Sequence, residues 1–261
     1  QGPMRPARAP VGATLALVLA ACGQVDFATR PDAAAARPDA TTDAAAAGPD
    51  AMPTGPVAAY PLDDPDGPVN DGTGHGLDAV CAGGCPARLA VGRVGAARTF
   101  TGGGEHLEVE DPRLALSTGF TVAAFVRQPV ANNVGTVLAK PHASGVGAAF
   151  ELALAGGETW FCTRPDASVG DEECLVAAPL AVDRWVHVAL TWDGATKRLF
   201  LDGAVAAEAA GVTTFDSGPL VLGADAEDGL PFTTPFIGDL DEVHLFDRAL
   251  GPAEVAALAA R

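Results

Sequence analysis

Positive charge is scarce in this chain of 261 residues, which has 16 lysines and arginines against 33 aspartates and glutamates. The formal net charge is −17, and residues 57–261 carry almost all of it, with 12 basic and 28 acidic side chains that give −16. Such a surface repels phosphate backbones, which argues against nucleic acid as a partner. The acidic residues either form a solvated surface or hold calcium, which prefers hard oxygen ligands.

Motifs of several catalytic classes are also missing. The histidines at 75, 106, 142, 187 and 244 have no metal-ligand spacing. No glycine-rich nucleotide-binding loop lies between a strand and a helix, and the serines occupy ordinary loop or turn settings. Aromatic residues make up only 6% of the chain.

No hydrophobic run is long enough to span a bilayer, but a shorter one lies near the amino end. A basic segment at residues 4–8 precedes an apolar run at residues 11–21, as in the core of a signal peptide. The run ends in Leu-Ala-Ala-Cys, which resembles the bacterial lipobox and implies that Cys22 is acylated. The alternative is an ordinary signal peptide with an incidental cysteine. We therefore expect residues 1–22 to direct export of a membrane-anchored lipoprotein to the bacterial outer membrane or cell surface.

Residues 23–56 have the composition of a linker. Pro-Asp-Ala recurs from residues 31, 38 and 49, separated by alanine runs. Proline interrupts each run and aspartate keeps it solvated, so neither helix nor a packed core is expected. As a flexible coil the segment would reach about 30 Å, enough to hold a folded domain away from a membrane.

Four cysteines remain beyond the lipobox: Cys81, Cys85, Cys162 and Cys174. An even number in an exported domain suggests two disulfides, for which three pairings exist. We favour Cys81–Cys85 and Cys162–Cys174, because each pair flanks a loop. The alternative, a four-cysteine zinc site, lacks the usual CxxC spacing.

Apolar residues after the linker alternate with period two. The pattern is clear in residues 120–127 (FTVAAFVR) and 185–192 (WVHVALTW), which predicts strands with one face on a core. Asp-Gly pairs at 193–194 and 202–203 favour tight hairpin turns. The one expected helix spans residues 252–260, where proline stands in the first turn. The pattern predicts an all-β sandwich over residues 57–261.

Several segments, in this order, also resemble a known family. They include YPLD (60–63), GRVGAARTFTGGGEHLEV (92–109), WVHVALTWDGATKRLFLDG (185–203) and FIGDLDEVHLFDRALGPAEVAALAAR (236–261). Together they resemble laminin-G-like domains of the concanavalin A-like lectin/glucanase type. The resemblance implies a jelly-roll sandwich of two antiparallel sheets with a short C-terminal helix. Members of the family commonly bind ligands or mediate adhesion, often through carbohydrate, and some hold calcium.

The resemblance also suggests where calcium would bind. Family members with calcium often hold it near the first strand, a glycine-rich loop and the last strand. Here those positions offer Asp63, the carbonyl groups near His75 and Gly76, and Asp241. The alternative is that Asp63 caps a turn and Asp241 faces solvent.

A sugar-binding face is the second expectation. Phe125, Arg127, Trp185 and Phe200 should project from their strands opposite the core face, and Trp160 is a further possible contact. Aromatic rings offer flat apolar surfaces on which sugars stack. The alternative is that other segments cover these rings as a second packing layer.

Catalysis is the least supported function. Carboxylates alternate at residues 239–242 and 108–110, yet neither segment matches the paired acids of glucan hydrolases. We expect a non-catalytic binding or adhesion module whose partner is a glycan or an envelope or extracellular protein. The alternative is a structural or protein-interaction component of the envelope without a glycan ligand.

Overall fold

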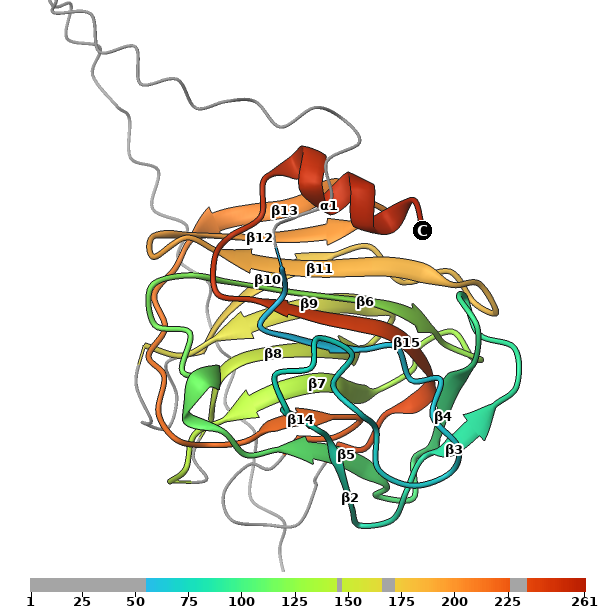
Figure 1. Ribbon diagram of the computed structural model, residues 1–261. Helices are drawn as coiled ribbons and strands as arrows, with labels where there is room; N and C mark the ends of the chain where they lie inside the picture. The colour runs from blue at the N-terminus through green and yellow to red at the C-terminus, as the bar shows by residue number, and fades with distance from the viewer. Residues whose placement is uncertain (1–54, 145–146, 166–171, 226–233) are drawn as a thin grey trace, which may run out of the picture. The chain divides into compact units, whose positions relative to one another are not determined.

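The computed structural model describes residues 55–144, 147–165, 172–225 and 234–261 (Figure 1). The expected signal peptide, Cys22 and all but the end of the expected linker lie outside these ranges. Within them, no helix has both the length and the apolar character that crossing a membrane requires.

Two antiparallel sheets lie face to face in the described residues. The larger sheet has the order β13 (Ala204–Ala210), β12 (Thr196–Leu201), β11 (Val186–Trp192), β6 (Phe120–Arg127), β15 (Ile237–Phe246), β4 (Ala97–Thr101) and β3 (Ala87–Leu89), and β1 (Ala58–Tyr60) also pairs with β15. The smaller sheet has the order β10 (Glu173–Ala177), β9 (Glu158–Thr163), β8 (Ala148–Ala155), β7 (Gly135–Pro141), β14 (Leu220–Leu222), β5 (His106–Val109) and β2 (Val80–Ala82). A 3-10 turn (Pro112–Leu114) and the helix α1 (Pro252–Ala259) complete the fold. The predicted jelly-roll sandwich with a C-terminal helix is confirmed.

The core lies between the sheets and follows from the period-two pattern. Phe120, at the start of β6, is fully buried, and its ring stacks on Phe150 of β8 with centroids 4.7 Å apart. The same ring meets Phe161 of β9 edge to face. Aromatic pairs of this kind join the two sheets, and burial of their apolar surface is the main source of stability.

A second, smaller apolar layer lies on the outer face of the larger sheet. Its buried members are Ala123, Ala189, Phe200, Phe246, Leu250, Val255 and Leu258. Val255 and Leu258 belong to α1, which covers this part of the sheet (Figure 1). At the start of the helix the Gly251 N–H donates to the Glu254 carboxylate, which Arg248 also binds. The outer face is therefore a packing surface at this end of the sheet.

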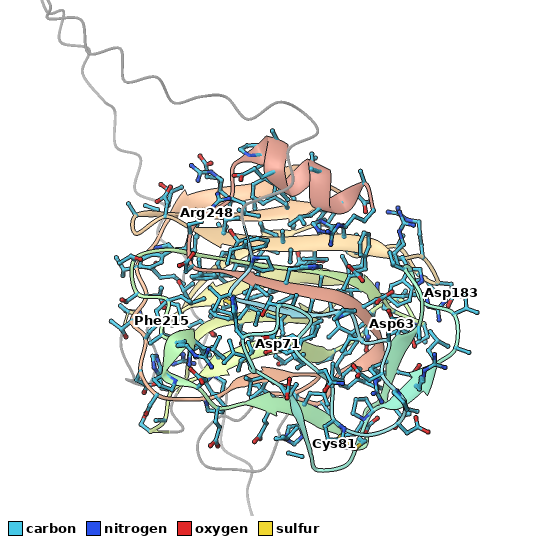
Figure 2. All side chains as sticks on the ribbon, viewed as in Figure 1. Asp63, Asp71, Cys81, Asp183, Phe215 and Arg248 are labelled. Atoms are coloured by element: carbon cyan, nitrogen blue, oxygen red, sulfur yellow. A yellow bond between two sulfur atoms is a disulfide. The ribbon has the colours of Figure 1, made fainter. Side chains whose placement is uncertain are left out.

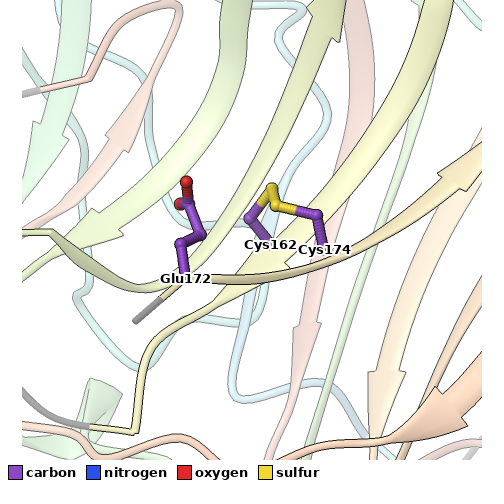
Figure 3. Close-up of side chains that lie close together, drawn as sticks. All are labelled: Cys162, Glu172 and Cys174. Carbon is purple, nitrogen blue, oxygen red and sulfur yellow. A yellow bond between two sulfur atoms is a disulfide. The ribbon is translucent and has the colours of Figure 1, made fainter. Parts of the chain in front are cut away.

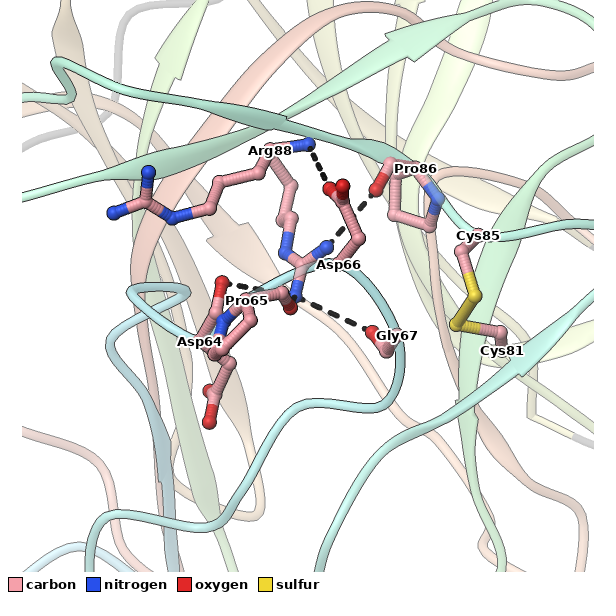
Figure 4. The surroundings of a disulfide bond; sticks show 9 residues. Asp64, Pro65, Asp66, Gly67, Cys81, Cys85, Pro86 and Arg88 are labelled. Atoms are coloured by element: carbon pink, nitrogen blue, oxygen red, sulfur yellow. Dashed lines mark hydrogen bonds between the residues drawn. A yellow bond between two sulfur atoms is a disulfide. The ribbon is translucent and has the colours of Figure 1, made fainter.

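Both favoured disulfides are present. Cys81 is bonded to Cys85, near the loop formed by residues 64–67 (Figure 4). Cys162 and Cys174 are bonded and occupy directly opposed positions on β9 and β10. Disulfides are typical of proteins that fold in an oxidising, exported compartment.

The loop after β1 is held by a buried arginine. The guanidinium of Arg98 is fully buried and donates to the carbonyl groups of Pro65, Gly67 and Pro86. Figure 4 shows these three carbonyls around one guanidinium. A buried cation needs such acceptors, so Arg98 fixes where the chain runs after β1.

Candidate functional site

The candidate site lies where β15 changes its neighbour. On one side β15 pairs with β6 throughout, whereas on the other side it pairs first with β4 and then with β1. Between these two partners, Asp241 and Glu242 face a gap, and the register with β6 shifts there. Asp63 follows β1, and the turn at residues 92–96 leads into β4. Three segments that are distant in sequence therefore meet at this gap.

Two carboxylates bind the 92–96 turn by its backbone. One oxygen of Asp241, Oδ2, accepts hydrogen bonds from the N–H groups of Arg93 and Val94 at 2.6 and 3.0 Å. Oδ1 of Asp63 accepts from the N–H of Ala96. The turn is thus held between an acid from the start of the domain and an acid from its last strand.

Glycine is required inside this turn. A Cβ on Gly92 would lie 2.3 Å from the Ala96 carbonyl oxygen and 2.5 Å from Oδ2 of Asp241. A Cβ on Gly95, which has φ +64°, would lie 2.3 Å from Oδ1 of Asp63. The two glycines therefore leave room for a cluster of carboxylate and carbonyl oxygens.

Two strained backbone positions lie beside the same cluster. Leu62 and Glu242 have φ values of 63° and 51°, in the left-handed region that side chains other than glycine rarely adopt. One precedes Asp63 and the other follows Asp241. Strain of this kind persists where the surrounding structure enforces it, and it is common at functional sites.

The electrostatics of the cluster favour a cation. Asp241 is 0% exposed, and its Oδ1 has no hydrogen-bond partner among the described residues. Burial raises the pKa of Asp241 to about 7, against the two backbone hydrogen bonds. Burial also raises the pKa of Glu242; Arg261 opposes this rise and Asp63 adds to it. An orphaned carboxylate oxygen among other hard oxygens fits the ligand preference of calcium.

Two of the four expected calcium positions, His75 and Gly76, make other contacts. Nδ1 of His75 lies 2.9 Å from the Val57 carbonyl oxygen, on the chain before β1, whereas Asp63 lies after β1. Gly76 adjoins His75, in a loop organised by Asp71, which lies apart from Asp63 in Figure 2. The carbonyl group of His75 accepts a hydrogen bond from Arg113 at 3.1 Å, and the carbonyl beside Asp241 is that of Ala96.

A polar and aromatic group continues from this cluster along the outer face of the larger sheet. In register, Asp241 faces Phe125 and Asp239 faces Arg127. Nε of Arg127 donates to Oδ2 of Asp239 at 2.8 Å, and the Thr99 hydroxyl donates to Oδ1 at 2.5 Å.

The ring of Trp185 completes this group. The guanidinium carbon of Arg127 lies 5.0 Å from the centre of the ring, and both side chains are half-buried. We call Trp185, Arg127, Asp239 and Thr99 the tryptophan patch. It places one aromatic ring, one cation and one hydroxyl at half-buried positions, next to the buried carboxylate of Asp239.

Comparison with known proteins identifies the family. A profile described as the concanavalin A-like lectin/glucanases superfamily matches residues 101–256, which is more than half of the chain. The chain belongs to this superfamily. A search of curated proteins by sequence finds no significant match.

Several solved structures have a similar fold at low sequence identity. The binding domain of Paraclostridial Mosquitocidal Protein 1 has a TM-score of 0.61 and 12% identity, covering 78% of this chain and 51% of that one. Domain 4 of AbnA, a GH43 extracellular arabinanase from Geobacillus stearothermophilus in complex with arabinotriose, has a TM-score of 0.56 and 20% identity, with 77% and 97% coverage. Trypanosoma rangeli sialidase has a TM-score of 0.60 and 17% identity, with 80% and 33% coverage.

These likenesses concern the fold alone. The chain spans about half the length of the toxin binding domains that it matches, 51% in the first.

The five expected sugar contacts of this concanavalin A-like domain do not form one face. Arg127 and Trp185 come together in the tryptophan patch. Phe125 is 3% exposed, beneath the guanidinium of Arg93 and edge to face with His187. Phe200 is 0% exposed beneath α1. The expectation that Phe125 and Phe200 offer rings to a ligand is corrected, because other side chains cover both.

Trp160 lies on the other sheet. It pairs with Ala153 of β8 and Val176 of β10 and is half-buried on the outer face of the smaller sheet. It is therefore not part of the tryptophan patch.

Arg93, Asp239 and Glu242 are site residues that the sequence interpretation did not assign. The signal for Arg93 was present, because two glycines three residues apart, Gly92 and Gly95, enclose it. Such spacing indicates a tight turn that approaches another segment closely.

One cluster of three metal-ligand side chains with mutually close ligand atoms occurs in the described residues. It consists of Cys162, Glu172 and Cys174 (Figure 3). Zinc binds cysteine as the thiolate, and both sulfur atoms here are joined in a disulfide. In this oxidised form the cluster is a structural link between β9 and β10.

Proposed function

We propose that this protein is a non-catalytic carbohydrate-binding module, carried on an exported lipoprotein, with calcium at the gap in β15. The observation that carries the proposal is the tryptophan patch beside Asp241. There a guanidinium lies between a carboxylate and an indole ring at the protein surface.

The tryptophan patch supplies the interactions that sugars use. The apolar face of a sugar ring stacks on an aromatic ring such as Trp185. The Thr99 hydroxyl offers an acceptor, and Arg127 offers charge-assisted donors, for hydroxyl groups at the rim of the same ring. Because Asp239 already orders Arg127, these polar groups are oriented before a ligand arrives, which lowers the entropy lost on binding.

Calcium would be held by Asp63, Asp241 and the Ala96 carbonyl, with water completing six to eight oxygens. Bound calcium would neutralise carboxylates whose charged form is destabilised by burial. The same carboxylates hold the 92–96 turn, which adjoins Phe125 through Arg93. Calcium bound there would therefore fix one border of the binding face.

The names of similar structures support a binding role. One is the binding domain of a toxin, and another is an arabinanase domain crystallised with arabinotriose. The sialidase and the arabinanase are enzymes by name, so an enzymatic role needs its own test.

The test is a glycan array probed with protein whose folding is verified by circular dichroism, with calcium present. We expect specific binding, and we expect Trp185→Ala to weaken it at least tenfold, because stacking on the indole is lost. Trp160→Ala is the matched control on the smaller sheet and should bind as well as the wild type.

Three results would change this conclusion. A silent array with folded protein, together with capture of a partner protein, would favour the envelope-interaction alternative. Loss of binding in Trp160→Ala instead of Trp185→Ala would move the site to the smaller sheet. Release of reducing sugar from common glucans would identify an enzyme.

A further inference from the structure

Almost every cation of the folded domain is already paired. Of the 12 lysines and arginines in residues 57–261, all of which are described, 11 have a side-chain contact with a carboxylate or a carbonyl oxygen. They are Arg88, Arg98, Arg113, Arg127, Lys140, Arg164, Arg184, Lys197, Arg198, Arg248 and Arg261. This is expected where 28 acids surround 12 bases.

Arg93 is the exception among the described residues. Its side chain is exposed, and it has neither a hydrogen bond nor an ion pair there. Its guanidinium carbon lies 5.1 Å from the centre of the Phe125 ring. A cation without a counter-ion in so acidic a domain is unusual, because nearby carboxylates normally take up such charges.

Arg93 is nevertheless held in place. Its backbone N–H donates to Asp241 at 2.6 Å, and the ring of Phe125 supports the guanidinium from below. The five N–H donors of an arginine form a rigid planar fork that matches a carboxylate. Because one face of the guanidinium lies on the Phe125 ring, its N–H edge stays available to an incoming anion.

A second guanidinium, that of Arg127, belongs to the neighbouring side chain on the same face of β6. Phe125 and Arg127 are two residues apart on β6 and point to the same face. Arg127 stacks on Trp185 and is neutralised by Asp239. Arg93 therefore adds an uncompensated positive charge beside a ring that suits a sugar.

We propose that Arg93 makes the binding face selective for sugars that carry a carboxylate, such as uronic acids, over neutral sugars of similar shape. This inference rests on the proposed carbohydrate-binding function. The carboxylate pairs with the fork of Arg93 while the sugar ring stacks on Trp185. A charge-assisted pair of this kind favours the acidic ligand by about tenfold or more.

Arg93 also covers Phe125, and the test must separate this packing role from recognition. Arg93→Met keeps a flexible apolar cover on the ring and removes the charge. Arg93→Lys keeps the charge and removes the planar fork. Arg198→Met changes net charge by the same amount on β12, where Arg198 is paired with Glu208, and serves as the control.

The experiment uses the full chain with calcium on a glycan array that contains matched neutral, carboxylated and sulfated members, followed by titration calorimetry on the best ligand. We expect the wild type and Arg198→Met to bind carboxylated members. Arg93→Met should bind them at least tenfold more weakly, and Arg93→Lys should fall between. All variants should melt within a few degrees of the wild type.

Each remaining outcome overturns the proposal. Binding of neutral glycans that Arg93→Met leaves unchanged would remove carboxylate selection and leave the carbohydrate-binding function intact. Binding of carboxylated members that is insensitive to Arg93→Met would assign selection to another residue. Preference for sulfated over carboxylated members would change the ligand class. No glycan binding by folded wild type would remove both this inference and the proposed function.

Discussion

At the scale of single residues, Asp241 connects the proposed calcium site with the sheet. It stands in β15 opposite Phe125, and its carboxylate holds the turn that carries Arg93. One oxygen of this buried carboxylate has no hydrogen-bond partner among the described residues, so the charged form of Asp241 has a high free energy. Protonation or a bound cation lowers that free energy. The state of Asp241 should therefore be visible in stability measurements.

We predict that metal-free wild type loses stability relative to Asp241→Asn as the pH rises from about 5 to 8. The pKa of Asp241 is about 7 in the folded protein and 3.8 in the reference state. Folding therefore takes up a proton between these values, and the stability that this proton provides is full at low pH and lost as the pH passes 7. Thermal melts in EDTA over this pH range measure the difference.

The comparison with Asp241→Asn is needed because histidines act in the opposite direction. Burial lowers the pKa of His187 and of His244 to about 4, so these residues destabilise the fold as the pH falls below their unfolded value of 6.5. The destabilisation by these two histidines is the same in the wild type and in Asp241→Asn. Millimolar calcium at pH 8 should raise the melting temperature of the wild type by several degrees and leave Asp241→Asn unchanged. An equal calcium response in both proteins would exclude Asp241 as a ligand.

The positions of the acids were predictable from the sequence, but their neighbours were not. Asp63 and Asp241 lie in segments that the family resemblance identifies. His75 was placed at the site because the family resemblance puts calcium near a glycine-rich loop, and glycines surround both His75 and Arg93. Which loop meets β15 depends on where β1 ends and β4 begins, and alternation along single strands does not contain that information.

At the scale of elements, α1 explains the difference between the expected and observed faces of the larger sheet. Period-two alternation separates two faces of a strand, but it does not show which neighbouring segment covers the outer one. Phe200 therefore has the pattern of an exposed aromatic residue and the environment of a core residue. The helix was expected from Pro252 and the residues after it, whereas its docking position was not.

We predict that Phe200→Ala lowers the free energy of unfolding by about 3–5 kcal/mol, because it leaves a cavity between β12 and α1. Leu258→Ala, on the facing side of α1, should cost about 2–5 kcal/mol. Urea denaturation measures both. Ligand binding by folded Phe200→Ala should equal that of the wild type, and a selective loss of binding with unchanged stability would restore Phe200 as a contact.

The two disulfides should contribute unequally. Cys162–Cys174 closes a loop with a sequence separation of 12 residues, and Cys81–Cys85 closes one of 4. The loop-entropy relation gives about 3 kcal/mol for the first and about 2 kcal/mol for the second. We predict that replacing Cys162 and Cys174 together by serine lowers the free energy of unfolding more than replacing Cys81 and Cys85 together. Chemical denaturation measures both. The reverse order would show that native-state effects outweigh loop length.

Pairing at β15 was the part of the fold that the sequence indicated least. The alternation in residues 120–127 and 185–192 predicted the strands that became β6 and β11, and the Asp-Gly turn at 202–203 predicted the hairpin to β13. The shift at Asp241 and the left-handed Glu242 break the alternation of β15. A long strand with two successive neighbours on one side requires such a break, and it arises from tertiary pairing.

At the scale of the whole molecule, the sequence predicts a lipid anchor at Cys22, which lies outside the described residues. We predict that full-length protein expressed in a bacterium fractionates with membranes and that Cys22→Ala moves it to the soluble fraction. Labelling with a radioactive or clickable fatty acid should mark the wild type alone. Labelled Cys22→Ala, or membrane association that survives the change, would contradict the anchor.

The position of β1 also determines how the domain responds to mechanical load. Tension on the chain ahead of Gly55 enters the fold through β1, whose Ala58 and Tyr60 are fully buried and whose three residues pair with β15. The Tyr60 hydroxyl also donates to the Leu77 carbonyl at 2.8 Å. A pulling force therefore acts on a buried strand with β15 as its pairing partner, and the domain should resist extension until β1 separates from β15.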